Sequence, residues 1–211
     1  MLSNYYTVKQ EGFNQITIQK SRFLGYVRRV ETEEQAQSFI QEIKKKHHDA
    51  NHNCSAYMIG ENNQIQKAND DGEPSGTAGV PILEVLKKQD LKDTAVVVTR
   101  YFGGIKLGAG GLIRAYGSTT SEAIKATGVV QRQLMSGISV TVDYSLLGKL
   151  ENVLRNSTHV LESINYLDKV EFLVYARDGE EEDFRSWITD LTSDQAEFDN
   201  KGTAYIELDV E

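Results

Sequence analysis

Hydrophobic and polar residues alternate in several short stretches of the first 130 residues, and this alternation predicts strands. The predicted strands are Tyr5–Gln10, Ile16–Lys20, Phe23–Val30, Cys54–Ile59, Gln64–Ala68 and Thr94–Phe102. Apolar residues at helical spacing predict three helices, one to about Lys46, one through Ile82 and Leu86, and one to about Ala126. The first helix begins at a capping box, in which Thr32 is the N-cap and Gln35 reaches back to it.

The last 80 residues show a more regular succession of elements. Strands are predicted at Ile138–Asp143, Val160–Tyr166, Val170–Tyr175 and Ala204–Val210, with helices at Ser145–Thr158 and Glu180–Leu191. This order, βαββαβ, is that of the ferredoxin-like fold. The sequence therefore predicts an α+β protein.

Charge divides the chain at the same place as the pattern does. The formal net charge is −8. Residues 1–132 hold 17 Lys and Arg against 14 Asp and Glu, a net of +3, and residues 133–211 have a net of −11. The first part also holds 13 of the 17 glycines. We therefore predict two domains, residues 1–132 and 137–211, and only the second is too acidic to bind a phosphate backbone.

Composition excludes several classes of protein. The longest apolar run is about four residues, Ala95–Val98, far short of a membrane span. Met1–Tyr6 has neither the charged nor the apolar region of a signal peptide. The single cysteine, Cys54, cannot form an intramolecular disulfide and suits a reducing compartment. We expect a cytoplasmic protein with no membrane partner.

The segment from Asp70 to Pro81 is the strongest candidate for chemistry. It places three carboxylates, those of Asp70, Asp71 and Glu73, within four residues, together with both prolines of the chain. Carboxylates crowded in this way are suited to hold Mg²⁺. The alternative is an acidic surface loop in which Thr77 caps the following helix.

A glycine-rich loop, Gly103–Gly111, joins a buried strand to a helix. Backbone N–H groups at a helix start form an anion site, and Arg100, Lys106 and Arg114 add positive charge. The loop is neither a P-loop nor a dinucleotide fingerprint, because no Gly-Lys-Ser/Thr ends it and Ile113 stands where a small residue is required. Tight packing of backbone against backbone remains the structural alternative.

Two further groups of residues are weaker candidates. His47, His48, His52 and Cys54 are close in sequence, but they lack a second ligand pair at zinc-site spacing. His52 and Cys54 point to the same face of a strand, which suits the wall of a pocket or a packed core. Tyr101 and Tyr116 flank the glycine loop and could stack on a base, or simply pack.

The sequence resembles the YigZ/IMPACT family, bacterial proteins of unknown role and eukaryotic translational regulators. The resemblance rests on Lys20-Ser-Arg-Phe23, His52-x-Cys54-x-Ala56, Asp70–Gly79 with Pro81, and Val96–Tyr116. It implies a first domain with the ribosomal protein S5 domain-2-like fold and a ferredoxin-like second domain similar to late domains of elongation factor G. The eukaryotic relatives bind the activator of an initiation-factor kinase, a pathway absent from bacteria, and the chain is similar to the bacterial branch.

Two functions follow as hypotheses. The first is a regulatory or binding protein associated with translation, whose first domain contacts RNA, the ribosome, a translation factor or another protein partner. The alternative is a Mg²⁺-dependent enzyme acting on a phosphorylated small molecule, although neither a nucleophile nor a general base is evident. In both hypotheses we expect one cleft with these residues: His52, Cys54, Asp70, Asp71, Glu73, Ser75, Thr77, Arg100, Tyr101, Gly103, Gly104, Lys106, Gly108, Gly110, Gly111 and Arg114.

Overall fold

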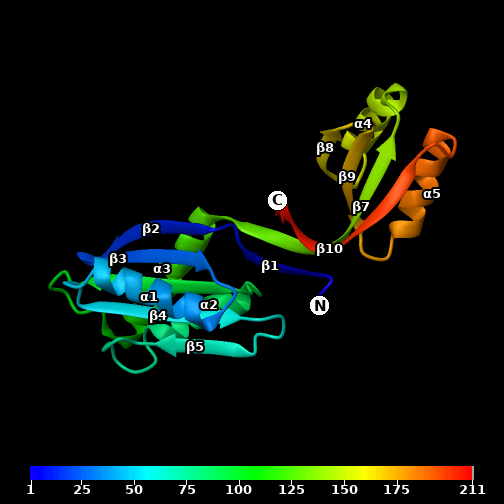
Figure 1. The fold of residues 1–211 in the computed structure, drawn as a ribbon. Helices are drawn as coiled ribbons and strands as arrows, with labels where there is room; N and C mark the ends of the chain where they lie inside the picture. Colours follow the sequence, from blue (N-terminus) through cyan, green and yellow to red (C-terminus); the bar gives the residue numbers. More distant parts are fainter. Residues whose placement is uncertain (211) are drawn as a thin grey trace. The chain divides into compact units, whose positions relative to one another are not determined.

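The structure is a computed structural model that describes residues 1–210, and its strands and helices form two units with separate hydrophobic cores (Figure 1). The first unit holds Tyr5–Gln131 and the second holds Arg132–Glu207. A short segment at each end of the chain groups with the unit that is farther from it in sequence. Leu2–Asn4 groups with the second unit, and residues 208–210 group with the first. Both units mix helices with sheet, as the pattern predicts.

An antiparallel sheet of five strands lies at the centre of the first unit. Its order is β2-β3-β6-β4-β5, so the apolar strand β6 is central. The strands are β2 (Glu11–Ile18), β3 (Ser21–Arg29), β4 (His52–Ile59), β5 (Ile65–Asn69) and β6 (Thr94–Tyr101). The first predicted strand, observed as β1 (Asn4–Val8), pairs with β7 (Val129–Val142) instead.

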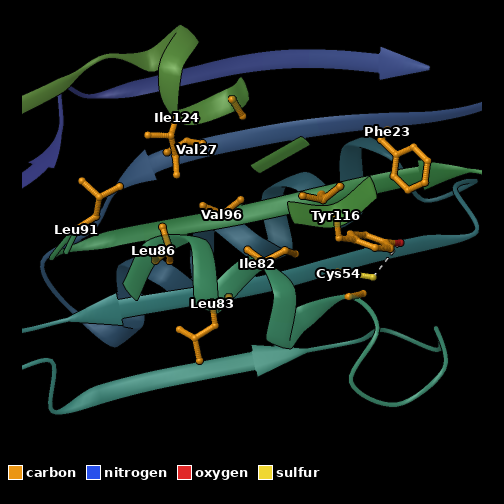
Figure 2. Packing of buried hydrophobic residues seen from close by; sticks show 14 of the residues in the cluster. Phe23, Val27, Cys54, Ile82, Leu83, Leu86, Leu91, Val96, Tyr116 and Ile124 are labelled. Carbon is orange, nitrogen blue, oxygen red and sulfur yellow. Dashed lines mark hydrogen bonds between the residues drawn. The ribbon is translucent and has the colours of Figure 1, made fainter. Parts of the chain in front are cut away.

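Helices cover both faces of this sheet. Helix α1 (Glu33–Lys46) packs on one face, and α2 (Gly79–Lys88) and α3 (Gly108–Thr127) pack on the other, where Figure 2 shows the core. Because side chains alternate along a strand, Val96 and Val98 of β6 face α2 and α3, while Val97 faces α1. Successive residues of one strand therefore belong to two different cores.

The predicted capping box at the start of α1 forms with one difference. Thr32 Oγ1 accepts a hydrogen bond from the Gln35 backbone N–H at 3.3 Å, as expected. The Gln35 side chain reaches back to the N–H of Glu31 at 2.7 Å, one residue before the predicted position. Both contacts satisfy backbone donors at the helix start.

The second unit has the predicted order βαββαβ. After β7 come α4 (Leu147–Arg155), β8 (Val160–Tyr166), β9 (Val170–Arg177), α5 (Glu181–Thr192) and β10 (Glu197–Asp209), and a short 3₁₀ turn, Tyr144–Leu146, precedes α4. Strand β9 pairs with β7 and β8, and β10 also pairs with β7. The strands β7 and β10 begin earlier than their alternation predicts, because pairing between strands, rather than the burial of one face, defines their extent.

None of the helices in residues 1–210 combines the length and hydropathy that a bilayer-spanning segment requires.

Candidate functional site

A cleft of about 450 Å³ opens in the first unit, where the acidic loop, the end of β6 and the start of α3 meet. Strand β4 supplies one wall, and the acidic loop supplies another. The lining residues are Asn51, His52, Glu73, Pro74, Arg100, Phe102, Lys106, Gly108 and Leu112. The structure thus brings together residues 51–52, 73–74 and 100–112.

A buried ion pair between Glu73 and Arg100 forms the floor of this cleft. Arg100 Nη1 donates to Glu73 Oε1 at 2.6 Å, and the two side chains are only 7% and 3% exposed. Tyr116 donates its hydroxyl to the same oxygen at 2.8 Å. The Nε of Arg100 is buried without a hydrogen-bond partner among the described residues, while Nη2 lies 3.5 Å from Ser21 Oγ. These contacts tie the acidic loop to the sheet and to α3.

His52 stands beside this ion pair with a defined orientation. Its Nδ1 lies 2.9 Å from the backbone carbonyl oxygen of Asp71. A carbonyl only accepts, so Nδ1 carries the hydrogen. The other nitrogen, Nε2, lies 3.8 Å from Glu73 Oε2, too far for a direct hydrogen bond.

Cys54 and Tyr116 lie behind the cleft, in the core (Figure 2). Cys54 Sγ is 3.3 Å from the Tyr116 hydroxyl and 3.0 Å from the carbonyl oxygen of Asp70. Burial raises the pKa of the Cys54 thiol, so the thiolate needed of a nucleophile is disfavoured. Tyr116 is fully buried and packs edge-on against Phe23 at 5.4 Å, so it cannot stack on a base.

Asp70 organises the acidic loop by binding backbone. Its carboxylate accepts hydrogen bonds from the N–H groups of Gly76, Ala78 and Gly79 at 2.8, 3.1 and 2.8 Å. Asp70 therefore caps α2 from a distance of eight or nine residues in sequence. The prediction that Thr77 is the cap is wrong, because its hydroxyl donates to the carbonyl of Pro74 at 2.7 Å.

The predicted set of three magnesium ligands does not form. Asp71 accepts from Lys44 Nζ and from the Asn53 backbone N–H, each at 2.6 Å. Asp70 faces the start of α2, and Glu73 faces Arg100, so the three carboxylates diverge. Within residues 1–210, no group of three or more His, Cys, Asp or Glu side chains is arranged to hold a metal ion. Adjacency in sequence did not translate into adjacency of oxygens, because each carboxylate finds a donor of its own.

The glycine-rich loop packs closely at one glycine and is open at two others. A Cβ at Gly103 would lie 2.0 Å from the backbone carbon of Lys20, so this glycine serves close packing. Gly104 and Gly108 instead adopt positive φ, at 85° and 70°, with open space around them. Helix α3 begins at Gly108 with no side-chain cap, which leaves its first N–H groups available beside the cleft.

Tyr101 does not line the cleft, and Phe102, for which no role was predicted, does. Tyr101 lies on the α1 face, where its hydroxyl donates to Asp49 Oδ1 at 3.0 Å. Phe102 follows in sequence and lines the cleft with a side chain that is 45% exposed. Side chains alternate along an extended chain, so Phe102 lies on the same face as Arg100 and Tyr101 lies on the other. This alternation could have been read from the sequence.

His47 has a structural role on the face opposite to the cleft. Its ring nitrogens bind the hydroxyls of Tyr26 and Tyr101 at 2.7 and 2.9 Å. Burial lowers the pKa of His47, which favours its neutral form. The four-residue zinc cluster considered for His47, His48, His52 and Cys54 is therefore not formed among the described residues.

Of the 16 predicted site residues, the cleft is lined by these five: His52, Glu73, Arg100, Lys106 and Gly108. The others support it from the core, belong to the two loops or α3 without lining it, or face α1: Cys54, Asp70, Asp71, Ser75, Thr77, Tyr101, Gly103, Gly104, Gly110, Gly111 and Arg114. The prediction missed four lining residues, namely Asn51, Pro74, Phe102 and Leu112. Leu112 follows Gly108 by one helical turn, a spacing that could have indicated it.

Comparison with known proteins agrees with the division of the chain. Residues 19–124 match the Impact N-terminal domain, and residues 140–195 match a domain of unknown function, DUF1949. The chain is 57% identical over 210 residues to the IMPACT family member YvyE of Bacillus subtilis, covering 100% of this chain and 97% of that protein. It is 34% identical over 139 residues to the IMPACT family member YigZ of Escherichia coli, covering 65% and 68%.

A crystal structure of a hypothetical protein is similar over nearly the whole chain. The TM-score is 0.61 at 26% sequence identity, covering 94% of this chain and 97% of that one. The Impact N-terminal domain match and the 57% identity over the whole chain show the family. The chain belongs to the IMPACT family.

Proposed function

We propose that this protein acts in translation as a binding protein, and that its first unit binds RNA at the cleft. The observation that carries the proposal is the composition of the cleft rim. An exposed lysine, Lys106, and the uncapped start of α3 stand beside an exposed aromatic ring, Phe102. Lys106 and the N–H groups at the start of α3 can bind a phosphate, and a base can stack on Phe102.

Electrostatics supports the same assignment. Arg100 lies 5.5 Å from the centre of the Phe102 ring, so the ring is held against a cation on one side. The first unit carries the positive share of the chain's charge, and the acidic residues 133–211 would repel a phosphate backbone. We therefore assign RNA contact to the first unit alone.

The fold supports a role in translation. The order βαββαβ, with β9 paired between β7 and β8, suits a ferredoxin-like fold. The family resemblance likens this fold to late domains of elongation factor G. We propose the S5 domain-2-like fold for the first unit, with domains 1–132 and 137–211. In the cytoplasm, the protein would then bind RNA that is exposed on the surface of the ribosome or of a translation factor.

The experiment measures binding of the full chain to a fluorescein-labelled single-stranded RNA by anisotropy, at two or more salt concentrations. The wild-type affinity should fall with salt, and Lys106→Ala should weaken binding and reduce the salt slope by about 1. Phe102→Ala should weaken binding about fivefold to a hundredfold, through lost stacking. Lys125→Ala is the matched control, because it removes an exposed lysine at the other end of α3.

Two results would overturn the proposal. One is wild-type binding that is absent or indifferent to salt. The other is an equal loss of affinity in Lys106→Ala and Lys125→Ala, because the effect would then be a matter of overall charge rather than of the cleft.

A further inference from the structure

Glu73 Oε2 and His52 Nε2 lie 3.8 Å apart, too far for a direct hydrogen bond between them. Both hydrogen bonds to the Glu73 carboxylate, from Arg100 and Tyr116, go to Oε1. Within the described residues, no hydrogen bond reaches Oε2. His52 is fixed through its other nitrogen, Nδ1. Two polar atoms therefore stand 3.8 Å apart, both on residues that line the cleft.

From this geometry we infer that the two atoms form a subsite for a ribose hydroxyl of the bound RNA. A hydroxyl oxygen bonded to both atoms lies about 2.8 Å from each, and a gap of 3.8 Å accommodates it. This subsite deepens the proposed function and rests on it. It adds selection of RNA over DNA to a site otherwise described only by phosphate and base contacts.

The hydrogen-bonding character of the two atoms selects a hydroxyl. Glu73 Oε2 belongs to a carboxylate paired with Arg100, and a carboxylate oxygen accepts hydrogen bonds and repels any group that only accepts, such as a phosphate oxygen. The His52 nitrogen accepts when the ring is neutral and donates when the ring is charged. A hydroxyl carries one hydrogen, so it bridges both atoms when the ring is charged, by donating to Glu73 Oε2 and accepting from His52 Nε2–H, and it donates to Glu73 alone when the ring is neutral.

The surrounding groups place a nucleotide correctly for this contact. Lys106 and the start of α3 would take the phosphate, and Phe102 would take the base, on the same cleft. The ribose connects phosphate and base in every nucleotide, so it lies between those two contacts. The 2′-hydroxyl is the group that distinguishes RNA from DNA at such a position.

The test compares the affinity of the full chain for three single strands of one sequence: RNA, DNA and 2′-O-methyl RNA. We expect RNA to bind about tenfold more tightly than the other two, which is the effect of one or two hydrogen bonds that involve a charged group. The methyl ether keeps the charge and the bases, but it cannot donate to Glu73.

A variant then assigns the selectivity to the subsite. His52→Ala should lower the affinity for RNA far more than that for DNA, so that the two affinities become about equal. His48→Ala is the matched control, because His48 is an exposed histidine that does not line the cleft. Circular dichroism checks that each variant is folded.

The outcomes separate this inference from the proposed function. Equal affinity for RNA, DNA and 2′-O-methyl RNA overturns the subsite and leaves RNA binding at the cleft intact. Selectivity that persists in His52→Ala overturns the subsite in the same way. Absence of binding to all three strands overturns the proposed function, and the subsite with it.

Discussion

At the scale of single residues, Glu73 decides how the cleft is built. It lies in a loop, yet its side chain is only 3% exposed, and one of its oxygens accepts hydrogen bonds from both Arg100 and Tyr116. Buried charges are retained only when they are paired and hydrogen-bonded. The pair therefore fixes the loop, and the unshared oxygen faces the cleft.

Replacing Glu73 by glutamine should destabilise the protein strongly. Arg100 would stay buried without a counter-charge, so the free energy of unfolding should fall by about 3–5 kcal/mol in urea titrations. Glu84→Gln is the control, because Glu84 forms an exposed pair with Lys87 on α2 and should change stability by no more than about 0.5 kcal/mol. Similar losses in the two variants would contradict a structural role for the buried pair.

At the scale of elements, the start of α2 depends on a residue far outside it. Ala78 stands at the N-cap position and offers no side-chain acceptor. Asp70 supplies the acceptor across the loop. Desolvation would raise the pKa of Asp70, but the three backbone N–H donors outweigh it, and its net pKa is lowered. The helix therefore begins where the loop closes, which the local sequence could not indicate.

The Asp70 cap should give a stability difference that depends on pH. Asp70→Ala should lower the free energy of unfolding by about 0.5–2 kcal/mol at neutral pH. Because the pKa is lower in the folded state, this contribution is complete above the usual value of 3.8 and is lost as the pH falls through the lowered pKa. Urea unfolding of both proteins between pH 7 and pH 2 measures it, and a constant difference over that range would contradict it.

At the scale of the whole molecule, each unit has its own core. The second unit contains the only tryptophan, Trp187, which packs beside Phe184 and His159 with ring centres 6.1 and 5.6 Å away. Burial lowers the pKa of His159, which favours the neutral form of its ring in this apolar cluster. Fluorescence of Trp187 therefore reports on the second unit.

The two units should respond separately to a substitution in the first. Glu73→Gln should lower the urea midpoint seen by far-ultraviolet circular dichroism and leave the midpoint of Trp187 fluorescence unchanged, because the altered contacts all lie in the first core. A midpoint that shifts equally by both probes would show that the two units unfold as one cooperative body.

The sequence by itself determined the order of the elements and pointed to the part of the chain that holds the candidate site. Periodicity depends on local burial, so it gave the strands and helices of both units in the right order, although β7 and β10 begin at Val129 and Glu197 rather than at Ile138 and Ala204. It also placed His52 and Cys54 on one face. Glycine and charge counts pointed to the first unit. Periodicity, glycine content and charge are all properties of residues close together in the sequence, so they can be read without the structure.

Only the tertiary structure decided which of those residues meet. Asp70, Asp71 and Glu73 are adjacent in sequence, yet they bind the start of α2, Lys44 and Arg100. A carboxylate accepts hydrogen bonds from the donors that the fold places near it. Where those donors belong to other elements, a local sequence pattern cannot predict them. The acidic cluster therefore became a scaffold, and the cleft beside it became the candidate site.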